Sequence, residues 1–455
     1  MAKIVCITTG LTGILNASFA LVNQLKKAGH EVIYASPRKV EEKVTAQGIA
    51  FFQLPEISLN AEPELPKFTG RFKKIARLKY KYQRAAERQA EALEKIAPQI
   101  FSTFLEETQP DLVLIDIELH EYIFKTFGKK LPMVLLSQWF SLWHRKGLPY
   151  LLTDTIPGEG WRGHPLTIKF AWQRIKLKRW FVFIKKRWVS GGTDRRSTLL
   201  ALAKKEKFPW TMIRENYWPG PFTYAELPVV SMTLAEMEFP HDVRPDLYYV
   251  GAMVAENRVE QPLEKIAAAR LSVALDYKIK NEVALIYCSV STLSKGDINF
   301  IKKIIAAVRG QSGWMLVISM GGLLDKDYLA ELPENVFAFA RVPQLKILKV
   351  ADLSVNHGGI HTINECIHFR VPMLVYSGKR SDQNGCAARV AYHQLGIMAD
   401  KDQDDVRAIR NKIEAVLKNK KYRSNVEAMH QYYLKYKENE TGTSVVNKFI
   451  AKEKI

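Results

Sequence analysis

The residues with the clearest chemical meaning lie in the stretch 356–383, which reads NHGGIHTINECIHFRVPMLVYSGKRSDQ. A short strand-like run, LSV, leads into His357-Gly358-Gly359, and Thr362 and Glu365 follow in the first turns of a predicted helix. Two glycines at a strand-to-helix junction leave backbone N–H groups uncovered, and a helix N-terminus carries partial positive charge, so this junction favours a phosphate. A carboxylate one turn further along is placed to bind the two hydroxyls of a ribose. The stretch therefore predicts a nucleoside-diphosphate site.

Other motifs surround this stretch in a fixed order. The full set is Pro343-Gln344, His357-Gly358-Gly359, Thr362, Glu365, Val371-Pro372 and Asp382-Gln383. It resembles the donor-binding signature of the UDP-glycosyltransferase family, which includes the glucuronosyl-, plant secondary-product and macrolide glycosyltransferases. The resemblance covers most of the chain and is specific mainly in the second half.

The resemblance implies a role for each residue that would hold the nucleotide. The backbone at Val342 and the side chain of Gln344 would hold the uracil, and Glu365 would bind the ribose hydroxyls. His357 would contact the diphosphate, because a doubly anionic group needs a donor close by.

The remaining donor-side residues would complete the phosphate site and hold the sugar. Gly359 would let the backbone approach the phosphate, and Thr362 would complete the cradle. Asp382 and Gln383 would bind hydroxyls of the transferred sugar, which discriminates strongly because a missing partner leaves a buried group unsatisfied.

Two positions depart from the family pattern. The stretch 289–292, SVST, stands where the family usually has S-x-G-S, so Thr292 keeps a hydroxyl for a phosphate but lacks the preceding glycine. His361 stands where many plant members have an asparagine, which leaves it as a further donor-side candidate.

No metal or other cofactor is expected, since the nucleotide sugar is a co-substrate. Helix N-termini and side chains can stabilise a leaving diphosphate without a metal. Asp325-Lys326-Asp327 has the form of a DxD metal motif, but it follows Gly321-Gly322 in a polar loop and is interpreted as surface.

The acceptor half lacks the family's catalytic base. In relatives that base is the histidine of a GHxNP-like loop after the first strand. The matching stretch 13–17, GILNA, places Ile14 at the histidine position and keeps Asn16 at that of the asparagine. Isoleucine cannot accept a proton from an acceptor hydroxyl. The family's supporting acid, at the end of the strand PDLVLID, is matched by Asp116.

Three interpretations of the missing histidine stay open. Asp116, or its neighbour Glu118 or His120, acts as the base. Alternatively, the acceptor is a phenol or carboxylate that is acidic enough to need little help. Thirdly, the chain has lost transferase chemistry and is a non-catalytic nucleotide-sugar-binding partner or sensor. A purely structural role for Asp116, capping the following helix, is also open.

Strand-like and helix-like runs alternate along the chain, which indicates parallel sheets covered on both faces. The expected strands are KIVCIT, HEVIYAS, IAFFQL, DLVLID and PMVLLS in the first half, and ALIYCS, WMLVIS, VFAFAR, LSVNHG and MLVYSG in the second. Two α/β, Rossmann-like doubly wound domains facing a cleft form the GT-B arrangement that the resemblance implies. We expect an acceptor domain at 1–252, a linker at 253–270 and a donor domain at 271–455, with the last helix, near 425–437, crossing back.

The bulk composition indicates a globular, cytoplasmic protein. No apolar run approaches the roughly 18–20 residues of a membrane span, and the N-terminus lacks the pattern of a secretory signal. The four cysteines are scattered without a CxxC pair, so neither zinc nor disulfides are expected. The net charge is +20, for which nucleic acid, anionic membranes and anionic substrates are the candidate partners.

An insertion without acidic residues, 160–193, helps to choose among these candidate partners. It carries nine Lys or Arg residues and seven aromatic residues. On a helix, one apolar stripe is formed by Leu166, Phe170, Leu177, Phe181, Ile184 and Trp188. Such a helix is typical of the interface of an anionic bilayer, and the alternative is a helix packed on its own domain with a solvated basic face.

A second acid-free basic stretch, 67–84, lies in the same half of the chain, where relatives bind the acceptor. Together the two stretches favour a small lipophilic or membrane-resident acceptor. Nothing resembles a nucleic-acid-reading module, so nucleic acid is not expected. The resemblance to the UDP-glycosyltransferase family implies an inverting transferase that moves a hexose from a nucleoside-diphosphate sugar, most simply UDP-glucose or a similar UDP-hexose, to this acceptor.

Overall fold

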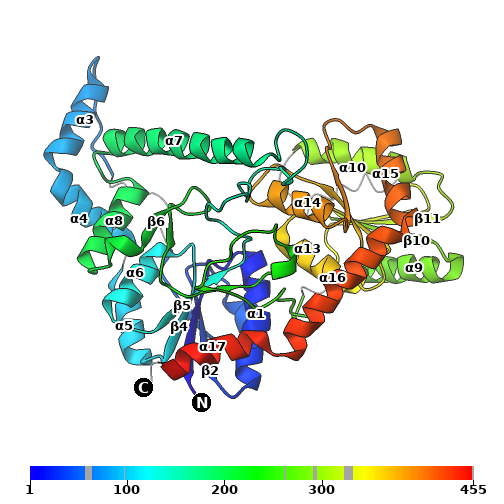
Figure 1. Cartoon of the computed structure of the whole chain (residues 1–455), viewed down its shortest axis with the longest axis horizontal. Coiled ribbons are helices and arrows are strands. Elements are labelled where there is room, and N and C mark those ends of the chain that lie inside the picture. The colour runs from blue at the N-terminus through cyan, green and yellow to red at the C-terminus, as the bar shows by residue number, and fades with distance from the viewer. Residues whose placement is uncertain (57–63, 97, 261–262, 290–294, 322–331, 453–455) are drawn as a thin grey trace.

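Two parallel β-sheets form the two halves of the molecule in the computed structural model (Figure 1). The structure describes residues 1–56, 64–96, 98–260, 263–289, 295–321 and 332–452. The ten strands expected from the sequence all form, which confirms the predicted pair of Rossmann-like domains. The predicted boundaries at 252 and 270 stay a prediction.

The first sheet has seven strands in the order β3-β2-β1-β4-β5-β8-β9, with every neighbouring pair parallel. The strands are β1 (Lys3–Ile7), β2 (Glu31–Ser36), β3 (Ala50–Gln53), β4 (Leu112–Asp116), β5 (Met133–Ser137), β8 (Val229–Ser231) and β9 (Leu247–Tyr249). The last two lie in the proline-punctuated stretch 227–262, where three-residue strands are too short to give a periodic pattern.

The second sheet has six parallel strands in the order β12-β11-β10-β13-β14-β15. The strands are β10 (Ala284–Ser289), β11 (Trp314–Ser319), β12 (Val336–Phe339), β13 (Leu353–Asn356), β14 (Met373–Tyr376) and β15 (Gly396–Ala399). The strand order reverses between β10 and β13. Ligands of doubly wound sheets bind at such a switch point, and the His357-Gly358-Gly359 loop follows β13 directly.

Helices cover the sheets and connect their strands. In the first half they are α1 (Thr12–Lys27), α2 (Glu41–Thr45), α3 (Lys73–Gln83), α4 (Ala85–Ile96), α5 (Gln99–Thr108), α6 (His120–Gly128), α7 (Pro165–Ser190), α8 (Arg195–Lys205), η1 (Trp210–Met212) and η2 (Ala235–Met237), with a small antiparallel pair β6 (Ile213–Glu215) and β7 (Phe222–Tyr224). In the second half they are α9 (Lys265–Asn281), α10 (Lys295–Val308), α12 (Gln344–Leu348), α13 (Ile360–His368), α14 (Gln383–Tyr392), α15 (Val406–Lys418), α16 (Lys420–Glu438) and α17 (Thr441–Lys452).

The residues of β1 alternate between two hydrophobic cores, one on each face of the first sheet. Ile4 and Cys6 pack with buried residues of α1 on one face, whereas Val5 and Ile7 pack with those of α5 and α6 on the other. This period of two is the pattern of a strand buried on both sides. All four cysteines are buried and free, in keeping with their scattered placement.

The C-terminal helices tie the two halves together. The helix α16 packs on α13 through Tyr433, which contacts the His368 ring with centroids 4.8 Å apart. Figure 1 shows α16 descending from the second half to α17, which lies beside α1. Val446 of α17 is fully buried in the core of the first half.

The helix α7 is the expected basic aromatic helix, and it is a long one. The His164 side chain accepts a hydrogen bond from the Leu166 backbone N–H, and Gly191 ends the helix with φ +67°. Within α7 only Ile168, Trp172 and Ser190 are buried, so the stripe predicted from the sequence does not pack on its own domain. None of the helices in the described part of the chain has the length and apolar character needed to cross a membrane.

Candidate active site

The loop after β13 has a backbone that only glycine can adopt. Gly358 has φ +82°, and a Cβ atom there would lie 2.9 Å from Val375 Cγ1 and 3.0 Å from the Gln383 carbonyl oxygen. The Gly358 N–H donates to Asn356 Oδ1 at 2.9 Å, which fixes the turn at the strand end. The loop thereby delivers His357 and Gly359 to the N-terminus of α13, where partial positive charge favours a phosphate.

The predicted sugar-binding pair lies at the same place. Asp382 Oδ2 accepts the Ile360 N–H at 3.3 Å and the Cys386 thiol at 3.1 Å, so it joins α14 to the first residue of α13. Burial raises the pKa of the Asp382 carboxyl. The neighbouring Gln383 has a buried Oε1 without a hydrogen-bond partner among the described residues, an acceptor that a sugar hydroxyl would satisfy.

Gln344 and Glu365, the residues predicted for the uracil and the ribose, are in direct contact. Gln344 Nε2 donates to Glu365 Oε2 at 2.5 Å, and Gln344 Oε1 accepts from the Tyr287 hydroxyl at 3.2 Å. Arg258 forms an ion pair with the other oxygen of Glu365 and also pairs with Glu260. Arg258 was not expected from the sequence, because it lies in a stretch without regular pattern.

Glu118 faces the donor half from the loop after β4. Its Oε1 accepts from Trp139 Nε1 at 2.8 Å and from Gln138 Nε2 at 3.5 Å. Gln138 Oε1 lies 2.7 Å from His361 Nε2, and His361 sits in the first turn of α13. An amide oxygen only accepts, so this nitrogen of His361 carries the proton. Glu118, Gln138 and His361 form one relay between the halves.

The helix α1 approaches His361 from the other side. A Cβ atom on Gly13 would lie 2.4 Å from His361 Cδ2, so a glycine is required for this approach. Burial, with the nearby charge of Arg258, lowers the pKa of His361 to about 4. His361 is therefore neutral at pH 7 and acts as a hydrogen-bond donor.

Asp116 and Glu118 form a pair of carboxyls with raised pKa values. Burial raises the pKa of Glu118 to about 8, with smaller contributions from the negative charges of Asp116 and Asp382. Burial raises the pKa of Asp116 to about 6. Such values near neutral pH suit proton transfer.

The geometry distinguishes the two carboxyls. Asp116 is fully buried, and its oxygens accept from Thr9 Oγ1 at 3.0 Å, from the Thr9 N–H at 3.3 Å and from the Glu118 N–H at 3.2 Å. Glu118 is partly exposed. An acceptor hydroxyl can therefore reach Glu118 but not Asp116.

A family model and known proteins match this chain. The model described as "Erythromycin biosynthesis protein CIII-like, C-terminal domain" matches residues 316–451. The uncharacterized UDP-glucosyltransferase YdhE of Bacillus subtilis (strain 168) is 31% identical over 156 residues, which are 34% of this chain and 39% of that protein. The NDP-glycosyltransferase YjiC of the same strain is 23% identical over 421 residues, 92% of this chain and 90% of that protein. The crystal structure of the glycotransferase of kitacinnamycin has the same fold, with a TM-score of 0.67, 17% identity and 98% of each chain covered.

The chain is therefore similar to glycosyltransferases, over 92% of its length in the case of YjiC. Its fold is GT-B, as expected from the sequence. The residues of the predicted donor-side motifs gather around α13, while the β4–α6 loop brings Glu118 up to them.

The other residues predicted for the site lie in different surroundings. Ile14 is fully buried in the core between α1 and the first sheet, so it does not line a cleft. Asn16 is half-buried on α1. Val342 is half-buried just before α12, and Thr362 is buried in α13. Thr292 lies outside the described residues.

His120 is not brought to Glu118. Its Nδ1 lies 2.7 Å from the Tyr224 hydroxyl, and burial with the charge of Arg195 lowers its pKa to about 3. A Cβ atom on Gly220 would lie 2.3 Å from its other ring nitrogen, so the backbone closes that side. His120 is a buried neutral residue of the first half.

A buried ion pair joins the two halves of the molecule. Arg389 of α14 pairs with Glu238, and both side chains are almost completely buried. The Arg389 guanidinium lies 4.5 Å from the Phe140 ring centroid and 4.4 Å from that of Phe239. Glu238 also accepts the Ser141 N–H at 2.8 Å, so its negative charge is well compensated.

No cluster of three or more His, Cys, Asp or Glu side chains suited to a metal occurs within the described ranges. Residues 325–327, which have the form of a metal motif, lie outside those ranges. Neither Gln138 nor Trp139 was expected from the sequence, since both follow β5 without a motif of their own. Only their place after a parallel strand, at the sheet edge where ligands bind, could have marked them.

Proposed function

We propose that this protein is an inverting glycosyltransferase that moves a hexose from UDP-glucose, or a similar nucleoside-diphosphate hexose, to a small or lipophilic acceptor. Gln344 and Glu365 would hold the uridine, and His357 with Thr362 would hold the diphosphate. Asp382 and Gln383 would hold the hexose. The names of the two Bacillus relatives, a UDP-glucosyltransferase and an NDP-glycosyltransferase, support a nucleotide-sugar donor.

The observation that carries the proposal is the position of Glu118 opposite the sugar-binding residues. Glu118 lies close enough to Asp382 for the two charges to interact, and it is linked through Gln138 to His361 beside the diphosphate site. An acceptor bound there would lie between a base and the anomeric carbon.

Glu118 would replace the missing histidine. It would take the proton from the acceptor hydroxyl while that oxygen forms a bond to the anomeric carbon from one face. The bond from that carbon to the diphosphate oxygen would break on the opposite face, and the electron pair would leave with UDP. The N-terminus of α13 and His357 would stabilise the added negative charge without a metal. Asp116, held beneath Glu118, would keep the pKa of the base high.

The donor part is tested by thermal unfolding with a panel of nucleotides and nucleotide sugars. UDP and a UDP-hexose should raise the melting temperature of the wild-type protein, because a ligand that binds only the folded state stabilises it. His357→Ala and Glu365→Ala should lose that shift. An unchanged shift in both variants would rule out this donor site.

A second candidate is a non-catalytic nucleotide-sugar-binding partner or sensor. It is favoured by Ile14, which stands at the position of the family's histidine and is fully buried. Both candidates predict donor binding, but only the first predicts turnover. Transfer of hexose to any acceptor, detected by mass spectrometry and abolished in Glu118→Gln, would exclude the second.

We also propose that the protein acts in the cytoplasm at a membrane surface, where a lipophilic acceptor would be concentrated. No nucleic-acid partner is proposed. The support for this part lies in α3 and α7.

A further inference from the structure

The helix α7 leaves its apolar stripe exposed. Six side chains of the stripe are each at least 43% exposed: Leu166, Phe170, Leu177, Phe181, Ile184 and Trp188. Figure 1 shows α7 along one rim of the molecule, spanning from the second half toward α3. Monomeric proteins rarely leave such a continuous apolar surface in water.

The opposite side of the helix holds it in place. Trp172 is buried, donates its Nε1–H to the Leu148 carbonyl at 2.8 Å, and contacts the Tyr150 ring with centroids 5.1 Å apart. At 100° per residue, Trp172 and Ile168 lie on the side opposite to the stripe. The orientation of the stripe is therefore fixed by packing.

Positive charges border the stripe on both sides. Lys169, Lys176 and Arg187 lie along one border at helical spacing, and Arg174, Lys178 and Lys185 lie along the other. The stretch 160–193 contains no acidic residue. An apolar centre between two cationic borders matches a bilayer with anionic headgroups, in which the apolar side chains enter the acyl boundary and the cations stay at the phosphates.

The helix α3 extends this surface. Lys81 Nζ donates to the Val189 carbonyl at 2.9 Å, and the Tyr82 hydroxyl donates to the Trp188 carbonyl at 2.9 Å, so α3 is attached to the end of α7. Phe72 and Ile75 on α3 are 68% and 66% exposed. The stretch 67–84 is also free of acidic residues, so the cationic character continues.

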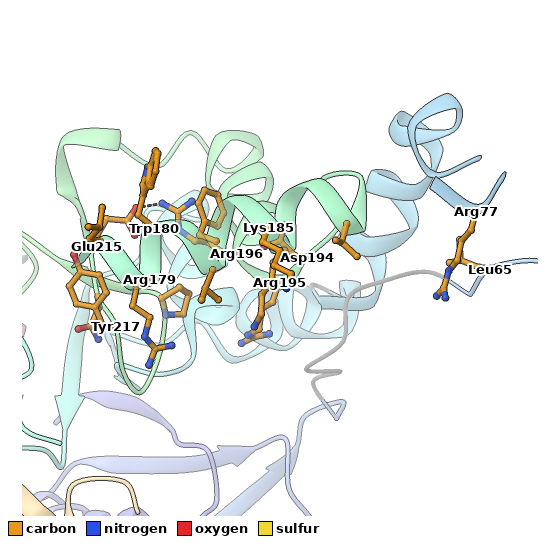
Figure 2. Close-up of a pocket in the computed structure, with 18 of the residues that line it drawn as sticks. Leu65, Arg77, Arg179, Trp180, Lys185, Asp194, Arg195, Arg196, Glu215 and Tyr217 are labelled. Atoms are coloured by element: carbon orange, nitrogen blue, oxygen red, sulfur yellow. Dashed lines mark hydrogen bonds and ion pairs between the residues drawn. The ribbon is translucent and has the colours of Figure 1, made fainter. Parts of the chain in front are cut away.

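A pocket of about 1900 Å³ lies between these helices and the first half. Ten Lys or Arg residues line it against three acidic ones, and Figure 2 shows Arg179 and Arg195 projecting below α7. Of the acids, Glu215 is already paired with Arg196. The pocket therefore keeps a large excess of positive charge next to the apolar surface, as an anionic headgroup requires.

One wall of the pocket packs against the residue that contacts Glu118. Tyr217 and Pro219 line it, and Trp218 between them packs edge-on against Trp139 with ring centroids 4.6 Å apart. Trp139 is the residue that donates to Glu118. A molecule entering from the surface of α7 would thus come close to the proposed base.

We propose that the outer faces of α7 and α3 form a docking surface for a bilayer of anionic phospholipids. The surface holds the pocket against the membrane, so a membrane-resident acceptor can reach Glu118 without crossing water. This inference deepens the proposed function and rests on it only for the acceptor, because vesicle binding requires no sugar transfer.

Sedimentation with vesicles tests the surface. The full chain should pellet with vesicles of phosphatidylcholine and phosphatidylglycerol at low ionic strength, and much less with phosphatidylcholine alone or at high salt. Trp emission should shift to the blue on binding, because exposed Trp188 would enter the interface. No pelleting with the anionic vesicles at low salt would overturn the proposal.

Two matched double variants identify the surface responsible. Phe181→Ser/Ile184→Ser should weaken vesicle binding by roughly tenfold or more, because two large apolar groups no longer enter the bilayer. Val273→Ser/Ile279→Ser, at positions on α9 that are 60% and 75% exposed, should bind as the wild type does. Equal binding by all three proteins would overturn the proposal.

A separate measurement distinguishes vesicle binding from self-association through the stripe. If a second copy covered the stripe, light scattering would show a dimer that Phe181→Ser/Ile184→Ser converts to a monomer, and this result would also overturn the proposal. Failure of transfer in a chain that still binds vesicles would contradict the proposed function and leave the docking surface standing.

Discussion

Gln138 and His361 join the two halves of the molecule through a hydrogen bond of 2.7 Å between Gln138 Oε1 and His361 Nε2. Gln138 comes from the loop after β5, and His361 comes from the first turn of α13. The amide nitrogen of the same Gln138 donates to Glu118. One side chain therefore sets the distance between the proposed base and the donor site.

Gln138→Leu should leave Glu118 less well oriented and should weaken the contact between the two halves. Removing the amide leaves the His361 N–H without its acceptor, which costs about 1–3 kcal/mol when the group is buried. Urea unfolding should show this loss, and kcat should fall more than donor affinity does. Gln431→Leu, an exposed substitution on α16, is the control and should change neither quantity.

Gly358→Ala should impair donor binding by moving the loop that carries His357. The alanine would sit at φ +82°, and its Cβ would lie 2.9 Å from Val375 Cγ1. Both the backbone strain and the contact destabilise the observed loop, by about 1–3 kcal/mol for the strain alone. Calorimetric titration with UDP should show weaker binding. Gly313→Ala, where a Cβ atom meets no neighbour, should bind UDP normally.

Arg389→Ala should loosen the contact between the halves. It leaves Glu238 buried without its cation, and breaking a buried pair in this way costs about 3–5 kcal/mol. Arg370→Ala serves as the control, since Arg370 is exposed and its ion pair with Glu427 is 3.9 Å long. Equal free energies of unfolding for the two variants would show that the Arg389–Glu238 pair contributes nothing to stability.

Protein stability should fall as pH rises through the range in which Glu118 titrates. The folded pKa is about 8 against an ordinary value of 4.5, so the folded state binds the proton more tightly than the unfolded state does. The stabilisation is complete below about pH 4.5 and is lost as pH rises toward 8. Glu118→Gln should flatten this slope by up to about 1.4 kcal/mol per pH unit between pH 6.5 and 8. His361 does not disturb this range of pH 6.5 to 8. Its pKa is lowered from 6.5 to about 4, so its effect is to reduce stability as the pH falls below 6.5. Parallel pH profiles for the two proteins would contradict the raised pKa.

The sequence predicted the fold well where local pattern and tertiary environment agree. β4, β10 and β14 are predominantly apolar runs buried on both faces, so their composition alone predicts them. β8 and β9 have three residues each, and their place in the sheet depends on the pairing of β8 with β5 and of β9 with β8. No local sequence pattern could have predicted these two strands.

The donor-side motifs were easier to recognise in the sequence than the acceptor side. Gly358, Glu365 and Asp382 lie within one continuous stretch, at the β13–α13 junction, in α13 and just before α14. Glu118 and Gln138 come from separate loops and meet only because β4 and β5 are neighbours in the sheet. Asp116 was the first candidate for the base, and only the structure shows that its oxygens are already occupied by Thr9 and the Glu118 N–H.

The orientation of α7 could not be predicted from the sequence either. The same pattern of apolar and basic residues fits a helix buried through its stripe and a helix exposed through it. The structure decides between them, because Trp172 on the other side forms the buried contact with Leu148.

The central claim is that Glu118 is the base, and the kcat of Glu118→Gln tests it most directly. With the acceptor identified by mass spectrometry, kcat should fall by roughly 10²–10⁴-fold, because glutamine cannot take the hydroxyl proton. UDP affinity should stay unchanged, and Glu107→Gln, an exposed control on α5, should keep the wild-type kcat. The wild-type kcat/KM should rise with pH toward about 8, as Glu118 loses its proton. A Glu118→Gln enzyme with a kcat within about threefold of the wild type would contradict the account, since that activity could not depend on a carboxylate at position 118.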